Sequence, residues 1–172
     1  FDDCEQCFFE AVEHDLVTLH ERVVQACADA RGRVASVREG VRVLMAELAA
    51  NPTFARAACI EVFNLGRDGA LYGVSMSERF SVLLADGSPP TVASELSSRL
   101  IAGAVWEVIR NSVARDETRR LPELEDVATY LILAPSIGAD EALGLLSIGH
   151  REQRTSSADH ERYLQLSAPA SR

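Results

Sequence analysis

Apolar residues recur at steps of three and four along most of the chain, which is the spacing of one face of an α-helix. Over residues 4–30 this face consists of Phe8, Val12, Leu16, Leu19, Val23 and Ala26 with Cys27. No stretch alternates apolar and polar residues between turn signals, as a half-buried strand would. The chain is therefore predicted to be all-α, an antiparallel bundle of about six to seven helices.

Glycine, proline and capping residues divide this pattern into segments. Ser36, with Glu39 three residues later, is typical of a helix N-cap. Asn51-Pro52 predicts the end of one helix and the first turn of the next. ADGSPP at 85–90 predicts a loop, and Pro135 predicts a helix end. Helices are expected over residues 4–30, 36–51, 52–66, 70–84, 91–114, 122–134 and 138–146.

Size and composition indicate one globular domain. The chain has 172 residues, of which 47% are hydrophobic, and this is enough for a single core. We expect the domain to span residues 1–146 and a polar, loosely held tail to follow over 147–172. No apolar run approaches the roughly 18 residues that a membrane span needs.

The formal net charge of −9 argues against direct nucleic-acid binding by these residues, because phosphate contact needs concentrated positive charge. The cysteines, with no secretory context, are expected to be free thiols in a reducing cytoplasm. They are Cys4, Cys7, Cys27 and Cys59.

The CEQC stretch pairs Cys4 with Cys7, a spacing shared by redox motifs and by half of a zinc site. A thioredoxin-type motif needs a βαβ surround, which the pattern does not provide. Glu10 and His14 share the helical stripe, but the stripe spreads over about two to three turns, too far for one ion. The pattern favours Cys7 as a small buried hydrophobic residue; a metal site and a redox switch remain the alternatives.

Enzyme signatures fail at each candidate position. Neither His20-Glu21 nor His160-Glu161 is completed to HExxH, and the glycines at 66–73 match no phosphate-binding loop. There is no GxSxG elbow. We therefore expect no catalytic residue, no metal, no cofactor and no enzymatic activity.

Three stretches together resemble the effector-binding and dimerisation domain of TetR-family transcriptional regulators. The opening of that family's fourth helix is similar to FDDCEQCFFEA (1–11). Its long eighth helix is similar to TVASELSSRLIAGAVWEVIRNSVA (91–114), and its ninth helix and exit to LPELEDVATYLILAPSIGADEAL (121–143). The likeness spans residues 1–146, and over 52–90 it follows the spacing more than the letters.

The resemblance implies a homodimer whose interface is a four-helix bundle of these last two helices from each subunit. The expected interface residues are Leu96, Leu100, Gly103, Leu124, Val127, Ala128 and Leu131. A second stripe, with Val105 and Ile109, suits the subunit's own core. The alternative is that both stripes are internal core in a monomer.

The resemblance also implies a pocket for a small apolar or aromatic effector. Its expected lining is Met45, Cys59, Phe63, Tyr72, Met76, Phe80 and Trp106, with Asn64 and Glu107 as polar contacts. Family members carry a DNA-binding head before this domain, so operator DNA would be bound only through residues preceding Phe1. The expected function is a ligand-responsive transcriptional regulator, with a repressor favoured.

Two other functions stay open. A stand-alone helical carrier of small molecules would share the same fold without a role at DNA. A helical enzyme is the third. The residues encoded upstream of Phe1 discriminate regulator from carrier, because only the regulator needs a helix-turn-helix there.

Overall fold

A computed structural model describes residues 2–84 and 92–146. Within these ranges the chain is helical and forms no strand, which confirms the all-α prediction. The expected loop at 85–90 and the tail at 147–172 lie outside the described residues. The elements are α1 (Asp2–Asp29), α2 (Arg33–Ala50), α3 (Pro52–Cys59), η1 (Glu61–Asn64), α4 (Gly66–Arg79), η2 (Phe80–Leu83), α5 (Val92–Ala114), η3 (Thr118–Leu124) and α6 (Glu125–Ile137), with further helix over 139–146.

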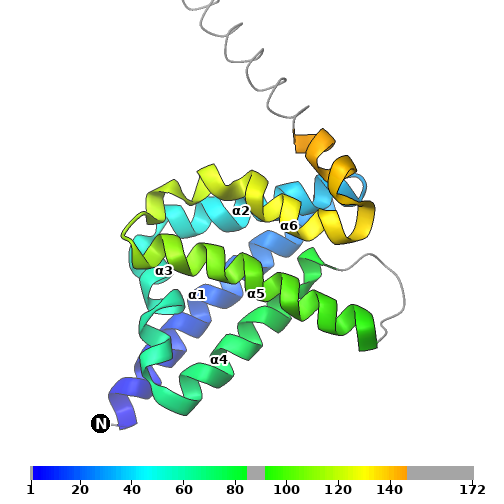
Figure 1. The fold of residues 1–172 in the computed structure, drawn as a ribbon. Coiled ribbons are helices and arrows are strands. Elements are labelled where there is room, and N and C mark those ends of the chain that lie inside the picture. Colours follow the sequence, from blue (N-terminus) through cyan, green and yellow to red (C-terminus); the bar gives the residue numbers. More distant parts are fainter. Residues whose placement is uncertain (1, 85–91, 147–172) are drawn as a thin grey trace, which may run out of the picture.

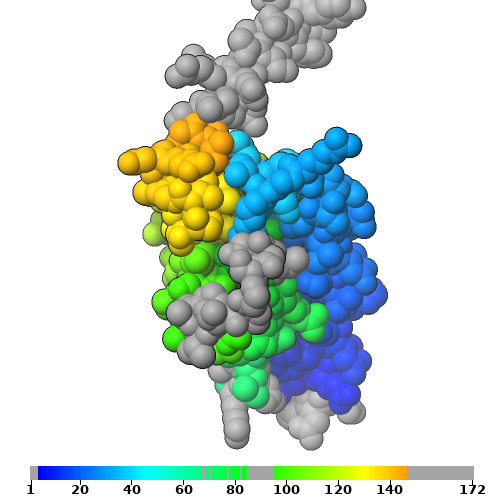
Figure 2. Space-filling view, turned by 90° about the vertical axis from the view of Figure 1, so that its right-hand side faces the viewer, coloured from blue at the N-terminus to red at the C-terminus, as the bar shows by residue number. Residues whose placement is uncertain are grey.

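Helix α2 lies beside α6 in the upper part of the bundle as drawn in Figure 1. It packs against α1 on one side and against η3 and α6 on another. Helix α5 contacts α3, α4 and α6. The start of α1 and the helix over 139–146 lie at opposite ends of the molecule (Figures 1 and 2). None of the described helices has the length and apolar character needed to cross a membrane.

The core contains the apolar face that the spacing predicted for the first helix. Val12, Leu16, Leu19 and Val23 are buried, and they meet an equally buried face of α2 formed by Val37, Val41, Leu44, Met45 and Leu48. Gly40 brings further elements close, because a Cβ built there would lie 2.4 Å from Leu83 Cδ2 of η2 and 2.5 Å from Cys27 Sγ of α1.

The predicted N-cap at Ser36 is wrong, because α2 begins earlier, at Arg33. Gly32 takes a φ of 85°, which glycine adopts without steric cost, so the new helix begins directly after it. The Ser36 hydroxyl instead donates to the Cys27 carbonyl, 3.0 Å away, and Glu39 binds Arg42. Ser36 therefore fastens the end of α1 to α2.

The helix expected to run to residue 66 ends at Cys59. Its predicted start is confirmed: Pro52 lies in the first turn, and Asn51 Oδ1 accepts from the Phe54 N–H at 3.1 Å. At Ile60 the backbone departs from helical angles, with a φ of −125°. A short 3₁₀ turn (η1) follows, and α4 then begins at Gly66, whose φ is 65°.

Proline does not end the sixth helix where the sequence predicted. Pro122 lies inside η3, α6 begins only at Glu125, and Pro135 lies within α6, which continues to Ile137. Pro135 is in the last turn, where it forfeits one backbone hydrogen bond and no long helix follows to be kinked. The Ser136 hydroxyl donates to the Leu133 carbonyl at 2.9 Å and supports this turn.

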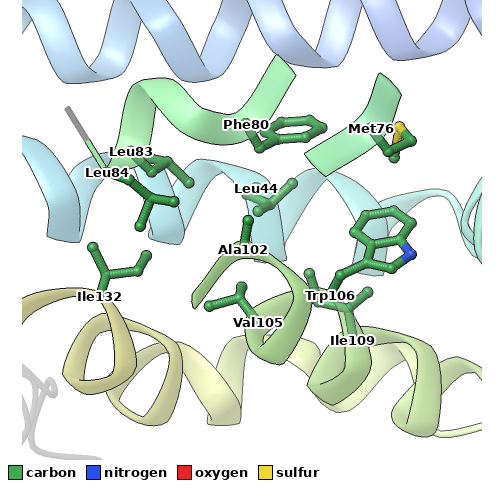
Figure 3. A pocket seen from close by; sticks show the side chains of 10 residues that line it. All are labelled: Leu44, Met76, Phe80, Leu83, Leu84, Ala102, Val105, Trp106, Ile109 and Ile132. Atoms are coloured by element: carbon green, nitrogen blue, oxygen red, sulfur yellow. The ribbon is translucent and has the colours of Figure 1, made fainter. Parts of the chain in front are cut away.

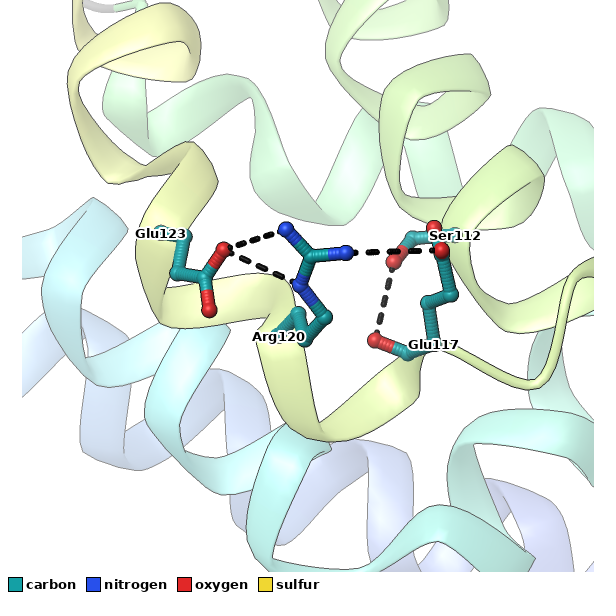
Figure 4. A network of polar contacts seen from close by, with 4 residues as sticks. All are labelled: Ser112, Glu117, Arg120 and Glu123. Atoms are coloured by element: carbon teal, nitrogen blue, oxygen red, sulfur yellow. Dashed lines mark hydrogen bonds and ion pairs between the residues drawn. The ribbon is translucent and has the colours of Figure 1, made fainter.

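A polar corner turns the chain from α5 into α6 (Figure 4). The Ser112 hydroxyl donates to the Glu117 carbonyl at 3.1 Å, and the Glu117 N–H donates to the Ser112 carbonyl at 2.9 Å. Arg120 then bridges the carboxylates of Glu117 and Glu123, at 3.5 and 2.9 Å. Asp116 adopts a φ of 58° in the turn. The corner returns α6 against α5 and so builds one wall of the cavity described next.

Candidate functional site

An apolar cavity lies where α2, α4, η2, α5 and α6 meet (Figure 3). Its free volume is about 20 Å³, which is room for about one water molecule. A ligand of ordinary size occupies a pocket of roughly 300–1,000 Å³. Such a ligand would therefore enter only if side chains of the wall moved aside. The lining consists of Leu44, Met76, Phe80, Leu83, Leu84, Ala102, Val105, Trp106, Ile109 and Ile132.

Met76, Phe80 and Trp106 are the expected pocket residues that the structure brings together here. Phe80 comes from η2, whereas Met76 and Trp106 come from α4 and α5, so residues distant in sequence meet across the cavity. Sequence reasoning assigned Val105 and Ile109 to the core and did not select Ala102. Ala102 precedes Trp106 by four residues, and this spacing places both side chains on one face of α5. The spacing could therefore have identified Ala102 from the sequence.

The other expected lining residues do not border the cavity. Met45, Cys59 and Tyr72 are buried in the core. Phe63 is partly exposed, and its ring covers Gly73, where an added Cβ would lie 2.7 Å from Phe63 Cε1.

The two expected polar contacts face solvent. Asn64 donates to Glu61 at 3.3 Å. Glu107 is exposed and accepts from Arg110 and Asn111, each at 2.7 Å. These bonds hold the pKa of the Glu107 carboxyl below its usual value, with the Arg110 hydrogen bond the main cause. Neither residue reaches the cavity.

Two hydrogen-bond donors near the cavity are buried and have no partner within the described residues. They are the hydroxyl of Tyr72 and the indole Nε1–H of Trp106. Burial raises the pKa of the Tyr72 hydroxyl above its usual value, so the group stays protonated. Burial likewise raises the pKa of the Cys59 thiol to about 12. These groups can donate hydrogen bonds, and none of them is poised as a base or a nucleophile at neutral pH.

Side chains next to the cavity also contact α1. The Phe80 ring meets the His20 ring edge-on, with centroids 6.0 Å apart. Arg79, the preceding residue, forms an ion pair with Glu13. A displacement of η2 or of the end of α4 would therefore reach the first helix through direct contacts.

The outer face of α5 carries apolar side chains that the described residues leave exposed. Leu96 is 57% exposed and Leu100 is 75% exposed, and no atom of the described residues lies within 4 Å of a Cβ built at Gly103. On α6, Val127 is 48% exposed and Leu131 is half-buried, and Leu124 at the end of η3 is half-buried as well. Ala128 differs from the other expected interface residues, since it is 0% exposed and packs in the chain's own core.

The first turns of α1 lie beyond the core. Cys4 and Cys7 are both exposed, so the predicted burial of Cys7 is wrong. The fully buried face of α1 begins at Val12, and before it only Phe8 and Phe9 are half-buried against the core. Among residues 2–84 and 92–146, no three His, Cys, Asp or Glu side chains gather in a group that could hold a metal ion.

No family model, curated protein or solved structure matches the chain. A functional assignment therefore depends on the geometry above and on the sequence pattern.

Proposed function

We propose that this chain is the effector-binding and dimerising part of a ligand-responsive transcriptional regulator of the TetR type, most simply a repressor. One observation carries the proposal: α5 has two apolar faces with different surroundings. Ala102, Val105, Trp106 and Ile109 face the cavity, whereas Leu96, Leu100 and Gly103 face solvent. A ligand-controlled dimer needs a binding site and an association surface that share a rigid element, and α5 supplies both.

The open face of α5 supports association with a second copy. Exposed large apolar side chains that gather on one surface are typical of protein contacts. Leu96 and Leu100 lie four residues apart on one face of α5, and Val127 is a further exposed apolar side chain on α6. Gly103 leaves a flat area against which a partner helix can approach closely. A two-fold dimer would place the same surface on both subunits, so each copy would cover the other.

The cavity supports control by an apolar effector. Because it is nearly filled in this conformation, a ligand must bind a form in which the wall has opened. Such a ligand shifts the population toward the open form by its differential affinity for the two forms. Nearly complete switching requires about 5.5 kcal/mol of that differential affinity.

Helix α1 would carry the change toward DNA. Phe80 and Arg79 contact His20 and Glu13 on α1, so opening of the wall would alter the position of this helix. A DNA-binding head would precede residue 1 and would move with α1. In a dimer, such movement changes the separation of two heads that must match half-sites about 34–36 Å apart.

Sedimentation velocity tests the association surface. The unmodified chain is expected to sediment as a dimer and Leu100→Glu as a folded monomer, because the substitution places a charge at the centre of the contact. Leu71→Glu is the matched control. Leu71 is 59% exposed on α4, outside the α5–α6 face, and its substitution should leave the dimer intact.

The same experiment separates regulator from carrier. A monomeric unmodified chain, or a Leu100→Glu dimer, would contradict the proposed interface. A monomer that still binds apolar compounds would instead favour the stand-alone carrier. For the regulator, a protein extended by the residues encoded upstream should shift its own upstream DNA in a gel, and a bound effector should release that DNA.

A further inference from the structure

Trp106, which lines the cavity, and Tyr72 on the neighbouring helix α4 each carry a hydrogen-bond donor with no partner among the described residues. Tyr72 is 8% exposed, and its hydroxyl is buried with no partner among the described residues. The indole Nε1–H of Trp106 is also buried with no partner among the described residues. In Figure 3 this nitrogen lies on the side of the indole ring away from Ala102 and Val105.

Met76 connects these donors. It lines the cavity together with Trp106, and Tyr72 lies four residues before it on α4, so the two side chains share one helix face. Met76 is unbranched and flexible, so it can change rotamer to make room. A ligand that displaced Met76 would extend from the apolar cavity along the face of α4 that carries Tyr72, with Trp106 in the same wall.

A buried donor without a partner is unfavourable, and most such groups in folded proteins are paired. Leaving these two unpaired lowers the stability of the ligand-free chain, and a ligand acceptor would remove that penalty. The cavity is otherwise lined by apolar side chains alone. An ionised ligand would lose its hydration there without gaining a counter-charge, and the nearby charges of Glu13 and Arg79 already pair with each other.

We propose that the effector is an uncharged, mainly apolar molecule that carries a hydrogen-bond acceptor oxygen, of the ketone or ether class, bound by the donors of Trp106 and Tyr72. The inference rests on the proposed function, because it specifies the ligand of the same cavity. The inference goes beyond the proposed function because it assigns recognition of the ligand's oxygen to the Tyr72 hydroxyl and the Trp106 Nε1–H. The raised pKa of Tyr72 is consistent, because the hydroxyl keeps its proton throughout the physiological range.

Indane and indanone form a matched pair of probes, since indanone has a ketone where indane has a methylene group. Trp106 is the only tryptophan in the chain, so its fluorescence reports on the cavity directly, and calorimetry gives the affinities. Indanone is expected to bind about tenfold more tightly than indane. This factor corresponds to the free energy gained when one buried donor acquires a hydrogen-bond partner. Indanone should also shift the Trp106 emission to longer wavelength, whereas indane should not.

Substitutions of Tyr72 and Trp106 test whether their donors cause the preference for indanone over indane. Tyr72→Phe and Trp106→Phe should each reduce the ratio of the two affinities, and the double variant should bring it close to one. Tyr130→Phe is the matched control, because Tyr130 lies on α6 outside the cavity lining, and it should keep the full ratio. Equal affinities of the two probes for the unmodified chain would overturn the acceptor inference and leave the cavity as the effector site. Binding of neither probe would overturn the cavity itself, and with it the proposed function.

A ligand-free measurement tests the unpaired state independently. Tyr72→Phe removes a hydroxyl that has no partner in residues 2–84 and 92–146, so the melting temperature of the chain should stay the same or rise. A hydroxyl that was in fact bonded would, on removal, lower the melting temperature by several degrees in a domain of this size. That result would contradict the inference.

Discussion

The ring of Phe80 meets the imidazole of His20 edge-on, with their centroids 6.0 Å apart. Phe80 is part of the cavity wall and His20 lies in the middle of α1. This contact therefore joins the cavity wall directly to α1.

His20→Ala should uncouple the cavity from α1 without emptying the cavity. Indanone should bind with nearly unchanged affinity, because His20 does not line the wall. Hydrogen exchange in α1, which should change when indanone binds the unmodified chain, should respond much less in the variant. His14→Ala, an exposed position on the same helix, is the control and should retain the full response. An undiminished response in His20→Ala would rule out this route.

Gly40→Ala should both destabilise the chain and weaken ligand binding. The added Cβ would lie 2.4 Å from Leu83 Cδ2 and 2.5 Å from Cys27 Sγ, and Leu83, which must shift, is part of the cavity wall. We expect a loss of about 1–3 kcal/mol in the free energy of unfolding, measured by urea denaturation. Gly144→Ala, with no atom of the described residues within 4 Å of its Cβ, should be neutral or stabilising by up to about 1 kcal/mol. Equal stabilities of the two variants would show that the approach at Gly40 is not tight.

Asn51→Ala should remove the cap of α3. The Asn51 Oδ1 accepts the Phe54 N–H at 3.1 Å, and loss of such a cap costs about 1 kcal/mol of the unfolding free energy. The control is Asn64→Ala, since Asn64 is exposed and donates only to Glu61. It should change stability by less than about 0.5 kcal/mol. A neutral Asn51→Ala would mean that the cap contributes nothing in solution.

The buried thiol of Cys59 should make the chain less stable in alkali. Its pKa is raised from 9.0 to about 12, so between these values the unfolded chain releases a proton that the folded chain keeps. The stabilising contribution is complete below pH 9.0 and is lost as the pH rises toward about 12. One such group lowers the unfolding free energy by about 1.4 kcal/mol per pH unit.

Urea unfolding between pH 9 and 10 measures that slope, and Cys59→Ala should reduce it by about the same amount. The exposed Cys4 provides the comparison, since Cys4→Ala should leave the slope unchanged. An unchanged slope in Cys59→Ala would show that the thiol is not buried in the folded chain.

Much of the fold could be predicted because periodicity reports which face of a helix is apolar. The buried side of α1, from Val12 to Val23, follows directly from it. Periodicity does not report where the covering elements stop, and for this reason Cys7 looked buried although the core begins at Val12. A capping pattern is equally local. Ser36 and Glu39 have the spacing of a capping box, but the helix begins at Arg33, directly after Gly32.

The site could be predicted only in part, because it depends on turns that the spacing does not reveal. The break at Ile60 reorients the residues after it. Phe63, which a continuous helix would place on the same face as the buried Cys59, is 37% exposed, and Asn64 is exposed as well. Adjacent residues on a helix point about 100° apart. Trp106 therefore lines the cavity while Glu107 faces solvent.

The separation of the two apolar faces of α5 has a consequence for how this protein can evolve. Ala102 and Trp106 shape the cavity, whereas Leu96, Leu100 and Gly103 occupy other positions on the same helix. A lineage can therefore exchange one set of residues while the other is held constant by selection. Under the proposed function, ligand preference can diverge among descendants that still form homodimers through the same surface. The dimer interface can likewise diverge among descendants that still bind the same ligand.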